Sequence, residues 1–190
     1  MNALRLAGVI KESIVDGPGL RYVVFAQGCP RRCKGCHNEE TWSFEGGFES
    51  APSVIVDDMK RNPLLKGVTL SGGEPFSQSG AFAELARLTR AAGYDVYTYT
   101  GYLYEDLLRL SAADRGVRAL LRYTDTLIDG PFISERMSYG LTFRGSDNQR
   151  VIGLRGGVEP KRKDVIYEYK ISNGRESAAP RKASCVQTSD

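Results

Sequence analysis

Residues 20–36 read LRYVVFAQGCPRRCKGC, an apolar run that leads directly into a loop rich in cysteine. The first part of this stretch, Leu20–Ala26, is dominated by β-branched and aromatic residues and predicts a buried strand. The loop that follows, Gln27–Thr41, carries three of the chain's four cysteines at the spacing C-x3-C-x2-C: Cys29, Cys33 and Cys36. The sequence therefore predicts one strand that delivers three thiols to a single loop.

Strands and helices alternate along the rest of the chain, as the period of the apolar residues indicates. Helices are predicted over Ser53–Arg61, Ser79–Ala92, Tyr104–Leu110 and Ala113–Tyr123. Further strands are predicted over Lys66–Ser71, Tyr94–Thr100, Thr126–Asp129 and Val151–Leu154, and Val165–Lys170 fits an edge strand. Repeats of strand, loop and helix predict right-handed βαβ units and a parallel sheet.

The length of the chain limits how far such a sheet can close. A complete barrel of eight βα units needs about 250 residues, whereas this chain has 190. The predicted fold class is therefore α/β, an open and partial TIM-like βα barrel. One domain is predicted over residues 1–171, because the segment 172–190 is small and polar and predicts a disordered tail. The fourth cysteine, Cys185, lies in that tail.

Composition excludes several classes of protein. Hydrophobic residues make up 41% of the chain and charged residues 26%, which is ordinary for a soluble globular protein. The formal net charge of +3 is too small to indicate a nucleic-acid binder. The N-terminus lacks the apolar stretch of a secretory signal, and no run approaches the roughly 20 apolar residues that span a bilayer. These features predict a cytoplasmic protein, with no membrane or nucleic-acid partner, whose thiols stay reduced.

Three thiolates on one short loop suit a cubane iron–sulfur cluster with a vacancy. Each thiolate would bind one iron, and the fourth iron would stay open to a substrate, whereas electron-transfer clusters normally have four cysteines. The place of Cys185 in the polar tail disfavours it as a fourth ligand. Arg31, Arg32 and Lys34 lie between the cysteines, where they either offset the charge of a cluster, meet an acidic partner or form a solvated loop.

Three other sites fit part of the same loop. Residues 33–37 form C-x-x-C-H, the attachment motif of c-type haem, but haem is usually attached outside the cytoplasm and this reading leaves Cys29 unused. A zinc site of three cysteines and His37 is hindered because Cys36 and His37 are adjacent. A dithiol redox pair of Cys33 and Cys36 also has no role for Cys29.

Polar and glycine-rich loops follow the later predicted strands. The turn Gly72-Gly73-Glu74-Pro75 allows close backbone approach, and its carbonyls with the Glu74 carboxylate suit an ammonium group. Thr100 and Asp129 also end strands, so these loops should gather with the cysteine loop at one edge of the sheet. Taken singly, each of them is also compatible with an ordinary turn at the end of a strand.

The cysteine spacing and the downstream Gly72-Gly73-Glu74-Pro75 resemble the radical S-adenosylmethionine (SAM) superfamily. Within it, the chain resembles the activating proteins of anaerobic ribonucleoside-triphosphate reductases (class III ribonucleotide reductase activases) from about Leu6 to Leu154. The motifs that carry this resemblance occur in the same order along the chain: Ser13–Arg21, Gln27–Pro30, Cys36–Asn38, Asn62–Leu65, Leu127–Phe132, Phe143–Ser146 and Asn148–Arg150.

The resemblance implies an oxidoreductase that binds a [4Fe–4S] cluster and SAM. It implies cluster ligation by Cys29, Cys33 and Cys36, with one open iron. It implies SAM contacts at Gly35, Cys36, His37, Gly72 and Gly73, and Glu74, Thr100 and Asp129 are added as candidates for positioning SAM. Many radical SAM proteins carry an aromatic residue just before the third cysteine, where this chain has Gly35, so a different group has to cover the adenine.

The implied reaction is the reductive cleavage of SAM to a radical that leaves a glycyl radical on a partner. That partner is the large subunit of the glycyl-radical reductase, and the electron is implied to come from a low-potential donor of the flavodoxin or ferredoxin type. No side chain is implied to act as acid, base or nucleophile, because the cofactors carry the chemistry. Three alternatives remain: an activase for another glycyl-radical enzyme, such as pyruvate formate-lyase, a radical SAM enzyme that acts on a small molecule, and a non-catalytic iron–sulfur electron-transfer protein.

Overall fold

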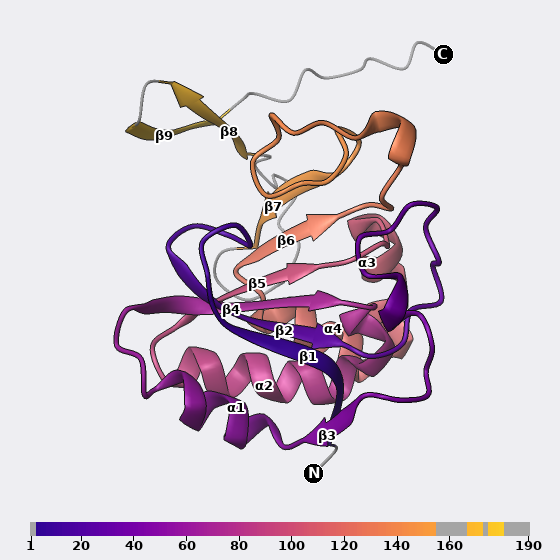
Figure 1. The fold of residues 1–190 in the computed structure, drawn as a ribbon, viewed down its shortest axis with the longest axis vertical. Coiled ribbons are helices and arrows are strands. Elements are labelled where there is room, and N and C mark those ends of the chain that lie inside the picture. The colour runs from indigo at the N-terminus through magenta and orange to yellow at the C-terminus, as the bar shows by residue number, and fades with distance from the viewer. Residues whose placement is uncertain (1–2, 155–166, 173–174, 181–190) are drawn as a thin grey trace.

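Seven strands form one open sheet in the order β3-β1-β2-β4-β5-β6-β7 (Figure 1). The structure is a computed structural model that describes residues 3–154, 167–172 and 175–180. The strands of this sheet are β1 (Leu4–Ser13), β2 (Leu20–Ala26), β3 (Phe48–Ser50), β4 (Leu65–Gly72), β5 (Asp95–Tyr99), β6 (Thr126–Asp129) and β7 (Arg150–Gly153). The helices are α1 (Pro52–Met59), α2 (Ser79–Ala91), α3 (Tyr104–Ala113) and α4 (Arg115–Tyr123), with short 3-10 turns η1 (Glu39–Thr41), η2 (Pro75–Gln78) and η3 (Ser134–Arg136).

The sheet is mixed, and this corrects the expectation of a parallel sheet. Strands β2, β4, β5 and β6 are parallel to one another, whereas β1 is antiparallel to β2, β3 to β1 and β7 to β6. The reason lies in the connections, because a parallel pair needs a crossover of a dozen or more residues, usually a helix. The short loop 14–19 joins β1 to β2, and segment 130–149 joins β6 to β7 without an α-helix.

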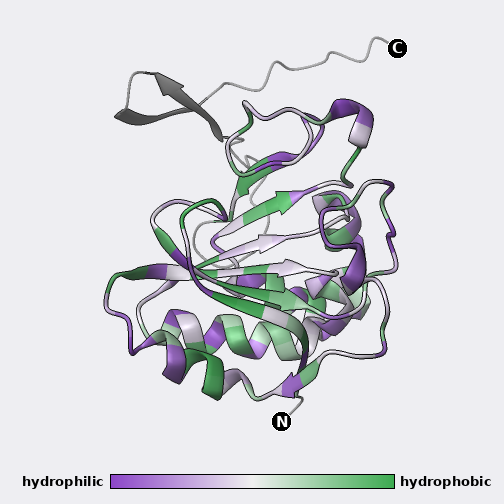
Figure 2. Cartoon of the chain, viewed as in Figure 1, coloured by the Kyte–Doolittle hydropathy of each residue, from purple (hydrophilic) through white to green (hydrophobic). Residues whose placement is uncertain are grey.

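One face of the sheet packs against the helices. Successive residues of a strand point to opposite faces, so Val96, Leu127 and Ile152 join the large core cluster that contains buried residues of all four helices. The next or preceding residue of the same strands, such as Tyr97 and Ile128, belongs to a small separate cluster on the other face. In Figure 2, α1 and α2 carry both hydrophilic and hydrophobic residues, as expected of helices buried on one side.

Helical positions agree closely with the sequence pattern, and two strands of the main sheet were missed. The predicted helices correspond to α1–α4, and the predicted strands within residues 20–154 correspond to β2, β4, β5, β6 and β7. Strands β1 and β3 were not predicted. No helix in the described ranges is both long and apolar enough to cross a membrane.

A separate two-stranded antiparallel sheet contains β8 (Tyr167–Ser172) and β9 (Arg175–Pro180). The edge strand predicted over Val165–Lys170 overlaps β8, but β8 pairs with β9 rather than with the main sheet. Strand β9 falls within the segment 172–190 that the sequence predicts as a tail. Cys185 lies outside the described residues, and the domain boundary at residue 171 stays a prediction.

Candidate functional site

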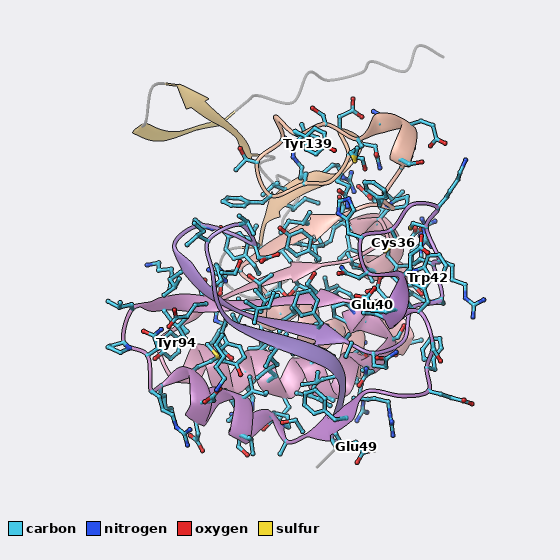
Figure 3. The ribbon with its side chains drawn as sticks, viewed as in Figure 1. Cys36, Glu40, Trp42, Glu49, Tyr94 and Tyr139 are labelled. Atoms are coloured by element: carbon cyan, nitrogen blue, oxygen red, sulfur yellow. The ribbon has the colours of Figure 1, made fainter. Side chains whose placement is uncertain are left out.

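A cavity of about 360 Å³ lies where the parallel strands end. Figure 3 shows Cys36 and Trp42 at the carboxyl ends of these strands, with Tyr94, which precedes β5, at the opposite end. The cavity brings together most of the residues that the sequence singled out: Cys29, Cys33, Cys36, His37, Gly72, Gly73, Glu74 and Thr100. Their convergence at one edge agrees with the rule that sites of parallel α/β sheets form at the carboxyl ends of strands.

The cysteine loop is closed on itself by backbone hydrogen bonds. The N–H of Gly28 donates to the carbonyl of Thr41 at 2.8 Å, and the N–H of Cys29 donates to the carbonyl of Trp42 at 3.1 Å. These bonds join the two ends of the loop directly after β2. The end of β2 therefore positions the start of the cysteine loop, and η1 brings the end of the loop back beside that start.

All three cysteines are free thiols that face the same cavity. Cys29 is buried, and Cys33 and Cys36 are half-buried. Burial raises the pKa of the Cys29 thiol, while backbone N–H groups of Arg31 and Arg32 donate to it and oppose that rise. The N–H of Asn38 lies 3.4 Å from the sulfur of Cys36. Such donors stabilise a thiolate, which is the form that binds iron.

This donor set fits an iron–sulfur cluster with one iron left open. Within the described ranges, no three His, Cys, Asp or Glu side chains are grouped to hold a single metal ion. A cubane cluster does not need such a group, because its cysteines bind different irons and stand further apart. Three free thiols around one cavity, with no fourth cysteine among the described residues, are what such a cluster requires.

The glycine turn is attached directly to the start of the cysteine loop. The N–H of Gly73 donates to the carbonyl of Ala26 at 2.8 Å, and the N–H of Glu74 donates to the carbonyl of Gly28 at 2.9 Å. A Cβ atom at Gly73 would lie 2.4 Å from the carbonyl oxygen of Gly28. Only glycine permits this approach, so the two motifs form one unit of structure.

Glu74 is fully buried behind the turn. Its carboxylate accepts hydrogen bonds from the hydroxyl of Thr100 at 3.0 Å, from the N–H of Gly101 at 2.9 Å and from the N–H of Phe76 at 3.1 Å. Burial raises the pKa of Glu74 to about 7, although these donors and the nearby Arg31 act in the opposite direction. Glu74 and Thr100 therefore form a hydrogen-bonded pair that links the end of β4 to the end of β5.

Asp129 and Gly35 are not among the residues that line the cavity. Asp129 is fully buried, accepts from the N–H of Tyr104 at 2.7 Å and forms an ion pair with Arg150, which also binds Glu105. The structure thus places the Asp129 carboxylate at the start of α3 instead of in the cavity. Gly35 is exposed and has a φ of +71°.

Several cavity residues were missed as site residues from the sequence. Asp16, Tyr99, Phe132 and Arg144 line the cavity. Asp16, Phe132 and Arg144 occur in motifs that supported the family resemblance. Those motifs were the available signal, although they indicate no role for the individual residues. Tyr99 directly precedes the predicted site residue Thr100, and its hydroxyl donates to the carbonyl of Phe143, another cavity residue, at 2.9 Å.

Two comparisons with known sequences identify relatives of the chain. A family model described as a 4Fe-4S single cluster domain matches residues 15–152. The anaerobic ribonucleoside-triphosphate reductase-activating protein of Vibrio cholerae is 37% identical over 144 residues, which cover 72% of this chain and 89% of the relative. The protein of that name from Haemophilus influenzae is 35% identical, again over 72% and 89%. The one from Escherichia coli is 33% identical over 150 residues, 75% of this chain and 94% of the relative.

Among solved structures, QueE from Escherichia coli is similar over 52% of this chain and 53% of its own, with a TM-score of 0.41 and 17% identity. The sequence relatives carry the assignment. They match the chain over nearly their whole length, and the family model extends from the loop before β2 to β7. The chain belongs to the family of anaerobic ribonucleoside-triphosphate reductase-activating proteins and contains the 4Fe–4S single cluster domain.

Proposed function

We propose that this chain is a radical SAM enzyme that activates anaerobic ribonucleoside-triphosphate reductase by generating a glycyl radical on it. The cluster, when bound, supplies the electron that cleaves SAM to methionine and a 5′-deoxyadenosyl radical, which abstracts a hydrogen atom from the target glycine. One observation carries the proposal. The three thiols and the glycine turn line a single cavity and are joined by the hydrogen bond from Glu74 N–H to the Gly28 carbonyl.

The residues of the cavity divide into three groups by the role proposed for them. Cys29, Cys33 and Cys36 are proposed to hold the cluster and leave one iron open. Gly72 and Gly73 expose backbone to the cavity, which suits the ammonium group of SAM, and His37 lies on the opposite end of the cysteine loop. Glu74 and Thr100 act as positioning residues, because their mutual hydrogen bonds hold the turn and the end of β5 together.

The proposed partners reach the cavity from different sides. The target glycine belongs to the reductase and must enter through the open side, where Val15 is 72% exposed and also lines the cavity. A low-potential donor of the flavodoxin or ferredoxin type is proposed to approach the exposed Arg32 and Lys34, which lie next to the half-buried Cys33. Reduced thiols and such a donor are both found in the cytoplasm, where we place the protein.

The fold proposal extends the observed topology. We propose that β2, β4, β5 and β6 with their helices are the parallel part of an incomplete βα barrel of the radical SAM type. Their consecutive order and the helices packed on a single face support this reading. The antiparallel strands β1, β3 and β7 then extend the sheet on both sides without closing it.

The test is anaerobic reconstitution with iron and sulfide, followed by dithionite and SAM, with 5′-deoxyadenosine as the measured product. We expect product from the wild type and from Cys185→Ala, and none from Cys33→Ala. Addition of SAM should also change the EPR spectrum of the reduced cluster. If protein with a full cluster gives no product and its EPR spectrum does not change when SAM is added, the chain would be an electron-transfer protein instead.

A second arm identifies the partner. Activated protein is mixed with anaerobic ribonucleoside-triphosphate reductase or with pyruvate formate-lyase, and the glycyl radical is measured by EPR. We expect the doublet of a glycyl radical on the reductase only. A radical on pyruvate formate-lyase alone would assign the chain to the other class of activases.

A further inference from the structure

An aromatic side chain from the end of the parallel sheet lies against the last part of the cysteine loop. Phe132 follows β6 by three residues and lines the cavity. Its ring centroid is 5.1 Å from that of His37, with the two rings tilted by 48°. Phe132 is half-buried and takes no part in the two hydrophobic clusters found among the described residues. Its ring therefore lines the cavity and is not part of the hydrophobic core.

Gly145 leaves room for this ring, and Gly35 lies beside it. A Cβ atom at Gly145 would lie 3.0 Å from Cδ2 and 3.1 Å from Cε2 of Phe132, closer than side chains normally pack. A Cβ atom at Gly35 would lie 3.9 Å from Cε1 of the same ring. The position just before the third cysteine thus carries no side chain, and the ring of Phe132 occupies the adjacent space.

The backbone around Phe132 is held on both sides. The side-chain amide of Asn148 donates to the carbonyl of Pro131 at 2.7 Å, and that of Gln149 donates to the carbonyl of Gly130 at 3.1 Å. The N–H of Ile133 donates to the hydroxyl of Ser146 at 3.2 Å. A side chain that is fixed before a ligand arrives loses little conformational entropy on binding, which favours affinity.

The glycine turn and Phe132 contact opposite ends of the cysteine loop. Gly73 and Glu74 are bonded to the start of the loop, at Ala26 and Gly28. Phe132 packs near its end, at His37. A ligand whose ammonium group lies at the turn, and which also carries a flat base, therefore has an aromatic wall available at the other end of the same cavity.

We propose that Phe132 supplies the stacking surface for the adenine of SAM, in the place left open by Gly35. This inference rests on the proposed function, because it takes SAM as the ligand of the cavity. Aromatic side chains bind nucleobases by stacking on their π faces, and removal of such a platform weakens binding about ten- to a hundredfold. Phe132 is thereby a specificity residue that recognises the nucleoside part of SAM.

The experiment measures the affinity of the cluster-loaded protein for SAM, from the change in the EPR spectrum during titration. Phe132→Leu should weaken binding at least about tenfold, whereas Phe132→Tyr should keep nearly the wild-type affinity because it keeps the aromatic face. Phe48→Leu is the matched control, since Phe48 is 47% exposed and does not line the cavity. Iron content and the spectrum without SAM should be the same in all four proteins.

Three results would overturn the inference. Unchanged affinity in Phe132→Leu would show that the ring does not contact the base, and equal weakening in Phe132→Leu and Phe132→Tyr would indicate shape rather than stacking. Loss of iron together with affinity would make Phe132 a support of the cysteine loop. Failure of the proposed function looks different, because the wild type itself would then leave the cluster spectrum unchanged when SAM is added.

Discussion

Glu74 is a carboxyl group without exposed surface, and its titration should be visible in the stability of the metal-free protein. Burial raises its pKa from 4.5 to about 7 in the folded state. Between these values the folded protein keeps a proton that the unfolded chain releases, so stability falls as pH rises through this window. The free energy of unfolding should lose on the order of 3 kcal/mol from this group.

The comparison with Glu74→Gln isolates that contribution, because the amide has nearly the same shape and no charge to titrate. Urea unfolding between pH 4.5 and 7.5 should give a shallower decline for the variant than for the wild type. Parallel curves for both proteins would mean that Glu74 is ionised over the whole range, held so by its donors at Thr100 and Gly101.

Gly72 and Gly93 share a φ of +88° and differ only in the space around them. A Cβ atom at Gly72 would lie 2.6 Å from the backbone nitrogen of Ala26, whereas nothing lies within 4 Å of one at Gly93. Gly93→Ala should cost about 1–2 kcal/mol for the left-handed backbone alone, and Gly72→Ala should cost clearly more. Urea denaturation of both variants measures the difference, and equal losses would contradict the close contact between β4 and β2.

At the scale of elements, Asp129 links three of them, namely β6, α3 and β7. Its carboxylate accepts from the N–H of Tyr104 at the start of α3 and pairs with Arg150 at the start of β7. Asp129→Ala leaves the guanidinium without this partner and should lower the free energy of unfolding by roughly 3 kcal/mol. Asp129→Asn should lose less, because its amide oxygen still accepts from Tyr104.

SAM affinity distinguishes this structural role from a role in binding. Folded Asp129→Asn, loaded with its cluster, should bind SAM as well as the wild type does, because Asp129 does not line the cavity. If Asp129→Asn lost most of its affinity for SAM while its stability stayed unchanged, Asp129 would have a role in binding SAM, as the sequence pattern first indicated.

The positions of most elements could be predicted from the sequence, and their directions could not. Periodicity located α1 to α4 and the strands from β2 to β7 other than β3, because each buries one regular face. Strand β1 escaped because apolar residues alternate only at its start, at Leu4 and Leu6, and most of the rest of the strand is partly or fully exposed. Strand β3 has three residues, too few for any pattern.

Cavity residues were predicted where a short sequence motif indicates a particular chemistry. They were missed where the fold brings together residues that are distant in the sequence. The cysteine spacing and the glycine turn are local features, and both lie in the cavity. The place of Phe132 beside His37 depends on how the segment after β6 returns across the loop, which no local pattern encodes. The side chain of Asp129 lies outside the cavity for a different reason, because successive residues of a strand face opposite sides of the sheet and its carboxylate lies at the start of α3.

At the scale of the whole molecule, stability should decrease from the middle of the sheet to its edges. Strands β2 and β4 have neighbours on both sides, whereas β3 and β7 are short edge strands. Amide hydrogen exchange followed by mass spectrometry should therefore show the greatest protection in β2 and β4 and the least in β3 and β7. Uniform protection across the sheet would indicate that the seven strands open only as one unit.

The order of the strands has a consequence for how the protein is made. From β2 onward, every strand of the main sheet except β3 is added to the edge formed by the one before it, so the sheet grows as the ribosome delivers the chain. Phe132 follows Cys29 by about a hundred residues, and at roughly 5–20 residues per second several seconds of translation separate them. During that time the thiols are present without the far wall of their cavity. We therefore expect the cavity to bind SAM only after the chain leaves the ribosome, on a sheet that is already complete.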